Sequence, residues 1–167
     1  MWVDKFYISN MAQLKFLSLN CHGFNKATLC YLQAVIHDYD IVLLQETWLS
    51  NQSSCVLDSI HPGFNVYHTS AMEHKLTSGV LTGRPFGGTA ILVCENVFKH
   101  ITLVRVNTMR ATAIYCSTPG HRSLVVMSVY MPWDDRSIYQ HDEYIFTIGC
   151  IQAVVDAHPD CNFLFWG

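Results

Sequence analysis

Two polar side chains stand directly after two short apolar runs, and together they could begin a metal site. Glu46 follows the run at 41–44, and Asn20 follows the run at 14–19. Runs of this length are typical of buried strands, and ligands gather at the carboxyl ends of such strands in sheets flanked by helices. A carboxylate with an amide is a start to an oxygen-rich site for magnesium, although two donors do not complete one. Taken singly, Glu46 could be a solvated loop residue and Asn20 a turn residue.

Two further segments could carry chemistry but have simpler readings. Cys21 and His22 lie beside Asn20, yet the sequence offers no second pair at zinc-ligand spacing, so it does not indicate zinc. The glycine-rich segment 83–88 invites comparison with a phosphate cradle, but it lacks P-loop spacing and does not lead from a strand into a helix. We interpret it as a turn that enters a strand, with Arg84 kept as a possible contact to phosphate or DNA.

The elements that must position these residues are predicted to form an α/β sandwich. A strand at 14–19, a helix at 25–37 capped by Asn25 and a strand at 41–44 make one α/β unit. Apolar stretches separated by turn residues then predict antiparallel strands at 64–68, 89–94, 101–106, 111–117 and 123–130. A helix follows, with capping-box spacing from Ser137 to Gln140, and the run at 162–166 is expected to be another buried strand.

Composition indicates one folded domain and excludes a strongly basic nucleic-acid binder. The 167 residues are 50% hydrophobic and 14% charged, with a net charge of −3 and scattered Lys and Arg. A phosphodiester-cutting enzyme can still draw positive charge from its metal. The seven cysteines form no CxxC pair and are expected to be reduced and buried. The sequence shows no secretory signal and no membrane span, which predicts an intracellular protein, nuclear or cytoplasmic.

Five motifs in order carry a resemblance to a known family: L-S-L-N-C-H-G, L-Q-E-T-W, G-R-P-F-G-G-T-A-I-L, S-V-Y-M-P and F-L-F-W-G. Their order resembles the endonuclease domains of LINE-type (non-LTR) retrotransposons, within the endonuclease/exonuclease/phosphatase superfamily. The resemblance spans 14–167 and leaves 1–13 as an N-terminal extension. It implies a two-sheet DNase I-like sandwich, a magnesium or manganese ion (Mg²⁺ or Mn²⁺) and DNA as the partner.

The resemblance also implies roles for single residues. Glu46 becomes the metal-binding carboxylate, and Asn20 becomes its neighbour, which helps to place the metal. Tyr130 in S-V-Y-M-P matches a tyrosine that points at the scissile phosphate; without the resemblance it reads as an aromatic residue capping a strand. Repair-type members of the superfamily commonly carry Asp where His22 stands. This departure favours the retroelement branch and removes one possible acid from the site.

The family continues beyond the last motif with Gly-Asp-x-Asn and later Ser-Asp-His, and Gly167 matches only the first letter of the former. We therefore expect a C-terminally truncated domain without efficient nuclease activity of its own. Exposed sheet edges and apolar surface would favour self-association. Two alternatives stay open: a non-catalytic remnant that at most binds nucleic acid or protein, and a phosphatase of the same fold acting on another phosphoester.

Overall fold

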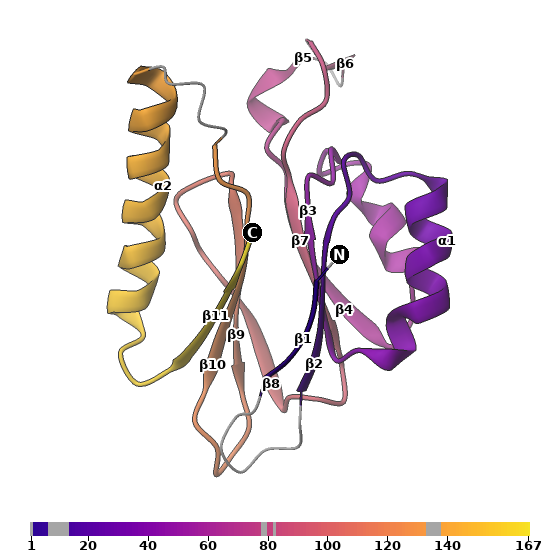
Figure 1. Cartoon of the computed structure of the whole chain (residues 1–167), viewed down its shortest axis with the longest axis vertical. Helices are drawn as coiled ribbons and strands as arrows, with labels where there is room; N and C mark the ends of the chain where they lie inside the picture. The colour runs from indigo at the N-terminus through magenta and orange to yellow at the C-terminus, as the bar shows by residue number, and fades with distance from the viewer. Residues whose placement is uncertain (1, 7–13, 78–79, 82, 133–137) are drawn as a thin grey trace.

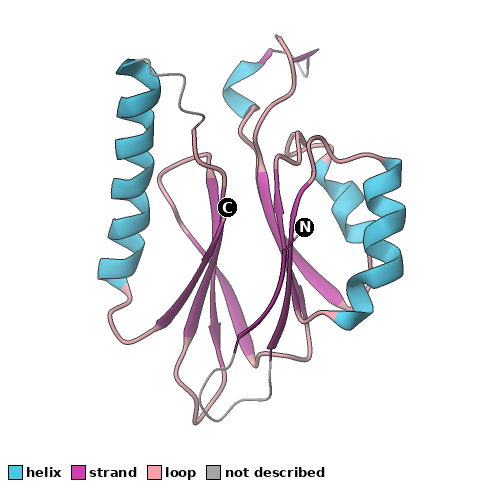
Figure 2. Cartoon of the chain, viewed as in Figure 1, coloured by secondary structure: helices cyan, strands magenta, loops and turns pink. Residues whose placement is uncertain are grey.

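Two β-sheets face each other, and helices cover the outer side of each sheet (Figures 1 and 2). This computed structural model describes residues 2–6, 14–77, 80–81, 83–132 and 138–167. The four layers run from α2 through the two sheets to α1. The expected two-sheet α/β sandwich is therefore confirmed.

The first sheet positions both polar residues that opened the sequence argument. Its strands, in spatial order, are β1 (Trp2–Phe6), β2 (Leu14–Asn20), β3 (Ile41–Gln45), β7 (Thr89–Cys94) and β4 (Phe64–Thr69). β2 and β3 are parallel, and the other neighbours are antiparallel. The crossover between β2 and β3 is helix α1 (Lys26–Val35), whose N-cap Asn25 accepts hydrogen bonds from the N–H groups of Ala27 and Thr28.

The second sheet has the order β11 (Asn162–Trp166), β10 (Leu124–Val129), β9 (Ala111–Ser117) and β8 (His100–Val104). β10 and β11 are parallel, and helix α2 (Ile138–Ala157) connects them over the outer face. A small hairpin of β5 (Leu76–Thr77) and β6 (Val80–Leu81) stands apart from both sheets. Short 3₁₀ turns cover Ile36–Asp38, Ser54–Ser59 and Glu73–Lys75.

Three apolar clusters fill the spaces between the layers. The cluster between the sheets includes Phe16, Leu43, Ile91, Ile114 and Val126. A second cluster packs the outer face of the first sheet against α1 around Leu17, Leu32, Leu44 and Leu92. A third joins the second sheet to α2 through Val125, Met127 and Val154. Because β3 faces a cluster on each side, all five of its residues are buried, as its continuous apolar run predicted.

Three details differ from the sequence expectation. β1 adds an edge strand that pairs with β2 within the segment expected to be an extension. β11 was expected to be a buried strand, but it lies at the sheet edge and only Leu164 is buried. All seven cysteines are free as expected, yet Cys30 and Cys55 are exposed and only Cys116 is buried. The expected capping box of α2 includes Ser137, which lies outside the described residues.

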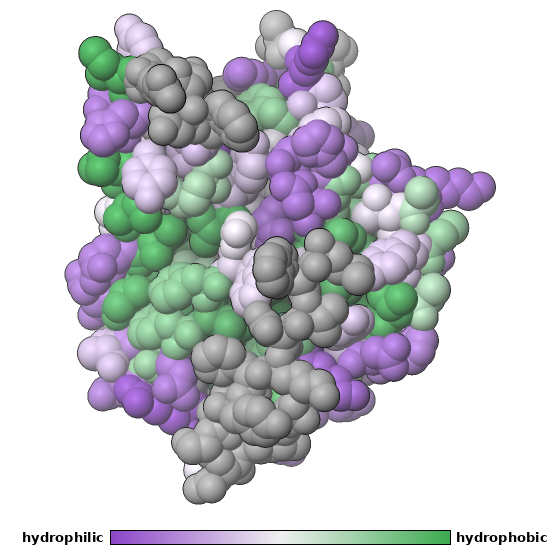
Figure 3. All heavy atoms as spheres, viewed as in Figure 1, coloured by the Kyte–Doolittle hydropathy of each residue, from purple (hydrophilic) through white to green (hydrophobic). Residues whose placement is uncertain are grey.

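The apolar repeat of Tyr144, Ile148, Ile151 and Val155 predicts one buried face of helix α2, but the structure does not bury that whole face, because the helix is apolar on most of its surface. Among the described side chains of α2, Thr147 and Val154 are buried, whereas Tyr144 and Ile148 of this repeat remain 44% and 43% exposed. Figure 3 shows apolar residues in green along the side where α2 and β11 lie. In the part of the chain that the structure describes, no helix is long and apolar enough to span a bilayer.

Candidate active site

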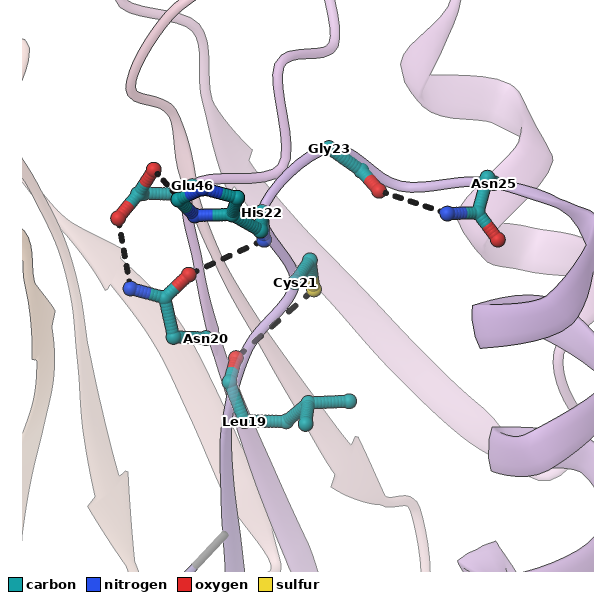
Figure 4. A network of polar contacts seen from close by, with 7 residues as sticks. All are labelled: Leu19, Asn20, Cys21, His22, Gly23, Asn25 and Glu46. Carbon is teal, nitrogen blue, oxygen red and sulfur yellow. Dashed lines mark hydrogen bonds and ion pairs between the residues drawn. The ribbon is translucent and has the colours of Figure 1, made fainter.

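Glu46 and Asn20 meet at the carboxyl ends of β2 and β3. The parallel register places Asn20 opposite Gln45, so Glu46 is the first residue past the sheet. The Asn20 Nδ2 group donates a hydrogen bond to Glu46 Oε1 at 2.7 Å (Figure 4). The Asn20 Oδ1 atom accepts a hydrogen bond from the backbone N–H of His22 at 3.0 Å. In this arrangement Asn20 orients the carboxylate, and acting as a metal ligand would require its amide to turn over.

His22 approaches the other oxygen of the same carboxylate. Its Nδ1 lies 3.3 Å from Glu46 Oε2, and the imidazole is 80% exposed whereas the Glu46 side chain is only 13% exposed. The Cys21 thiol lies on the other side of the loop, within 3.8 Å of the Leu19 carbonyl oxygen (Figure 4). Burial raises the pKa of Cys21 to about 12, with a further contribution from the Glu46 charge. The thiol therefore stays protonated at neutral pH in this environment.

Backbone hydrogen bonds from two loops hold the segment 45–48. The first loop donates at 2.8 to 2.9 Å from the N–H groups of Cys21, Gly23 and Phe24 to the carbonyls of Gln45, Glu46 and Thr47. The N–H groups of Thr47 and Trp48 donate to the carbonyls of Gly88 and Gly87. Within this arrangement His22, Glu46 and Trp48 all have positive φ, at 51°, 50° and 55°. Non-glycine residues rarely adopt this conformation, and when they do they cluster at functional sites.

Gly87 and Gly88 have a structural role, which agrees with reading 83–88 as a turn. Gly88 has φ of 81°, and a Cβ there would lie 2.6 Å from Thr47 Oγ1. A Cβ on Gly87 would lie 2.8 Å from the Cβ of Ala71. A side chain at Gly88 would therefore push this loop away from residues 47–48, and one at Gly87 would push it away from Ala71.

A buried polar chain beneath the site joins the two sheets. Ser18 Oγ donates to Gln45 Oε1 at 3.2 Å, and Gln45 Nε2 donates to Ser128 Oγ at 3.0 Å. The Ser128 hydroxyl in turn donates to the Leu44 carbonyl at 2.9 Å. These groups are buried and paired, so they fix how the two sheets sit relative to each other next to Glu46.

His68 lies under the loop as a neutral imidazole. Its Nε2 is 3.3 Å from Thr47 Oγ1, and its buried Nδ1 has no hydrogen-bond partner among the described residues. Burial lowers the pKa of His68 from 6.5 to about 4, although the Glu73 charge works in the opposite direction. A group that stays uncharged at neutral pH can support the loop without repelling a cation at Glu46.

Tyr130 follows β10 and comes within electrostatic range of Glu46. Burial raises the pKa of Tyr130, the Glu46 charge raises it further, and the Arg110 charge lowers it. The Arg110 guanidinium lies 5.5 Å from the centre of the Tyr130 ring and is held by Glu143 of α2 at 2.6 Å. The phenol therefore stays protonated at neutral pH and is available as a hydrogen-bond donor.

Arg84 is exposed in the loop between β6 and β7. Among the described residues, no hydrogen bond or ion pair connects it to Glu46, Asn20 or Tyr130. The structure thus brings three of the four sequence-predicted site residues into one neighbourhood and leaves Arg84 free to contact a ligand from the loop.

The described side chains around Glu46 offer few ligands for a divalent ion. In the described part of the chain, no group of three or more His, Cys, Asp or Glu side chains is arranged to hold a metal. Mg²⁺, however, is usually bound through one or two carboxylates and keeps several waters. Glu46, with one carboxylate oxygen fixed by Asn20, fits this minimal kind of site.

A profile of the Endonuclease/Exonuclease/phosphatase family matches residues 17–160. The match covers most of the sequence, and the chain belongs to this family. No curated protein sequence matches it.

Solved structures share the fold at low identity. An AP endonuclease from Leishmania major is 14% identical with a TM-score of 0.65, over 92% of this chain and 53% of that one. The APE2 catalytic domain from Xenopus laevis is 18% identical with a TM-score of 0.57, over 85% and 53%. A 3′ phosphatase from Neisseria bound to a product DNA hairpin is 15% identical with a TM-score of 0.53, over 87% and 54%. The chain thus spans about half the length of these proteins.

Sequence reasoning missed three contributors to the site. The pairing of His22 with Glu46 depends on a positive φ at both residues, which has no clear sequence signal outside glycine. Gln45 and Ser128 are polar positions inside apolar strands, and this is a usable signal, but the partner of each lies more than eighty residues away. His68 gives no sign in the sequence that its ring is buried.

Proposed function

We propose that the chain carries the metal-binding and phosphate-contacting part of a divalent-metal-dependent DNA phosphodiesterase of the LINE-type retrotransposon kind. The observation that carries the proposal is the Glu46 carboxylate, held by Asn20 at the carboxyl ends of two parallel strands with Tyr130 nearby. Membership of the family supports metal-dependent phosphoester chemistry. The DNA-directed neighbours, including a phosphatase bound to a DNA hairpin, support DNA as the substrate.

Glu46 would hold the ion, Mg²⁺ or Mn²⁺, and Asn20 would keep its carboxylate oriented. When bound, such an ion neutralises the charge that develops on a phosphodiester during hydrolysis. The low exposure of Glu46 strengthens its attraction for a cation, because less water screens the carboxylate. A hydrogen bond from Asn20 also limits the loss of side-chain freedom on binding.

Tyr130 and Arg84 would contact the phosphate backbone. The protonated phenol of Tyr130 can donate a hydrogen bond to a phosphate oxygen, and the Arg110 charge over its ring favours an anion at this position. Exposed Arg84 can reach a neighbouring phosphate from the loop of 83–88. These contacts position DNA without reading its sequence.

The motif order supports the retrotransposon subtype, as does His22 in place of the Asp common in repair enzymes. Hydrolysis also needs a base that activates water. Among the described residues, no contact joins Glu46 to a second carboxylate that could serve as this base. We therefore infer that these 167 residues bind a cation and DNA but do not cleave DNA efficiently.

Two measurements on the 167-residue chain test the proposal. Isothermal titration with Mg²⁺ or Mn²⁺ should show binding that Glu46→Gln abolishes and that Glu95→Gln, outside the site, retains. Incubation of supercoiled plasmid with Mg²⁺ should give no nicking above background. Cleavage that survives repurification and disappears in Glu46→Gln would overturn the inferred inactivity.

A substrate comparison separates DNA from other phosphoesters. Retention of a short DNA duplex should depend on the cation, on Glu46 and on Arg84. Equal or tighter binding of an inositol phosphate at the same residues would instead favour a phosphatase of the same fold. If the chain binds neither Mg²⁺ nor Mn²⁺, the remaining alternative is a non-catalytic remnant that at most binds nucleic acid or protein.

A further inference from the structure

The imidazole of His22 faces the Glu46 carboxylate, and the proposed function gives it no role. The ring nitrogen Nδ1 lies 3.3 Å from Glu46 Oε2, and the ring is open to solvent. Asn20 already occupies the other carboxylate oxygen, Oε1. One oxygen of Glu46 and one nitrogen of His22 therefore face each other across a short gap.

The width of this gap suits two ligands of one metal ion. With ligand distances of about 2.1 Å, neighbouring donors lie about 3.0 Å apart in an octahedral site and about 3.4 Å apart in a tetrahedral one. The observed separation of 3.3 Å lies between these values. A direct hydrogen bond between the ring and the carboxylate has a similar length, and the variants described below distinguish it from shared metal ligation.

His22 is held in place before any ion arrives. Its backbone N–H donates a hydrogen bond to Asn20 Oδ1, and its φ of 51° turns the chain so that the ring comes back over Glu46 (Figure 4). The Trp48 ring lies 5.5 Å from the imidazole, tilted by 42°. Asn20 thus holds the Glu46 carboxylate through its amide nitrogen and the backbone of His22 through its amide oxygen.

We propose that His22 Nδ1 and Glu46 Oε2 bind one divalent cation together, and that this pair favours Co²⁺, Ni²⁺ or Zn²⁺ over Mg²⁺. Imidazole suits these ions, whereas Mg²⁺ prefers oxygen ligands alone. The inference deepens the proposed function, because it rests on the same cation site at Glu46. It changes the expected metal preference and assigns Asn20 to positioning.

Isothermal titration of the 167-residue chain with Co²⁺ and separately with Mg²⁺ tests the proposal. His22→Gly removes the ring and suits the positive φ, and it should weaken Co²⁺ binding at least tenfold while changing Mg²⁺ binding less than twofold. Glu46→Gln should abolish both. His22→Asp should reverse the preference by adding an oxygen ligand. The midpoint of thermal unfolding checks that each variant is folded.

The matched control is His37→Gly, because His37 Nε2 also lies near a carboxylate, 3.8 Å from Asp38 Oδ1, but both side chains are largely exposed. It should leave the Co²⁺ site at Glu46 unchanged. One outcome would contradict the inference alone: His22→Gly and His22→Asp keep full Co²⁺ affinity while Glu46→Gln loses it. His22 would then be only a hydrogen-bond partner of Glu46, and the proposed function would stand. If Glu46→Gln binds both ions normally, the proposed cation site itself is wrong.

Discussion

The side-chain amide of Gln45 crosses between the two sheets and donates a hydrogen bond to the Ser128 hydroxyl at 3.0 Å. Glu46 follows the first of these residues, and Tyr130 lies two positions beyond the second. The two candidate residues thus extend from strands that are joined to each other just beneath the site. The relative placement of Glu46 and Tyr130 depends on this buried contact.

Ser128→Ala should destabilise the fold, because it leaves the buried Gln45 amide without its acceptor. We expect a loss of about 1 to 3 kcal/mol in the free energy of unfolding, measured by urea denaturation. Adding Gln45→Met should cost less than the sum of the two single changes. Strict additivity of the two changes would argue that the residues do not interact.

Asn20→Ala should weaken cation binding roughly tenfold or more, because the Glu46 carboxylate loses the group that orients it. The fold should change little, since this hydrogen bond lies in an exposed part of the molecule. Asn25→Ala is the contrasting variant: loss of the α1 cap should cost about 1 kcal/mol of stability with cation affinity kept. Cation titration and urea denaturation of both variants check this. The prediction is wrong if Asn25→Ala loses cation affinity or if Asn20→Ala loses mainly stability.

Gly88→Ala should destabilise the chain more than Gly120→Ala. Both glycines have φ of 81°, but a Cβ on Gly88 meets Thr47 Oγ1 at 2.6 Å, whereas nothing lies within 4 Å of one on Gly120. Because the two glycines share the same φ, the difference between the unfolding free energies of the two variants measures the steric contact at Gly88. We expect this difference to be roughly 1 to 3 kcal/mol. Similar unfolding free energies for the two variants would mean that the loop of 83–88 moves away freely.

His68 should make the stability fall as the pH falls from about 6.5 to about 4. The unfolded chain takes up this proton near pH 6.5, and the folded chain only near pH 4, so acid favours unfolding across this window. The contribution, on the order of 2 to 3 kcal/mol, is complete above pH 6.5. His68→Gln should flatten the pH dependence of the unfolding free energy, whereas the same change at exposed His100 should not. Parallel curves for the chain and His68→Gln would contradict the prediction.

The exposed apolar side chains of α2 and β11 should drive self-association. Ile145 of α2 is 55% exposed, and Phe165 of β11 is 42% exposed. Ile145→Lys with Phe165→Lys should shift the chain toward monomer in sedimentation velocity. Leu103→Lys is the matched control, because Leu103 is 60% exposed on β8 at the opposite edge of the same sheet. A monomeric parent chain at high micromolar concentration would remove the basis for this prediction.

The strands and the first helix could be predicted because their periodicity and caps are local. The run at 41–44 is apolar on both faces, and Asn25 has a side chain suited to a cap, so β3 and α1 lie within a few residues of their expected places. Strand β1 could not be predicted, since its pairing with β2 depends on tertiary contact. The apolar repeat in α2 did not identify the whole of its buried side, because apolar residues surround the helix and give no single stripe.

Of the candidate site, the strand pattern of the sequence predicted only the residues that follow the carboxyl ends of the two parallel strands. Parallel strands bring their carboxyl ends to one edge, and this led from the sequence to Asn20 and Glu46. The positive φ values at His22, Glu46 and Trp48 come from hydrogen bonds between three separate segments, which no local pattern encodes. Arg84 was singled out as a charge in a glycine-rich turn, and its part in ligand binding stays a prediction.

The loop around Glu46 is shaped by main-chain groups, which every non-proline residue possesses. Carbonyl and N–H groups of 21–24, 45–48 and 87–88 set its path, while the donor side chains of Asn20, His22 and Glu46 project from it. Replacing those side chains therefore need not rebuild the loop. Substitutions among these three donors can therefore change which cation the loop attracts while the path of its main chain stays the same.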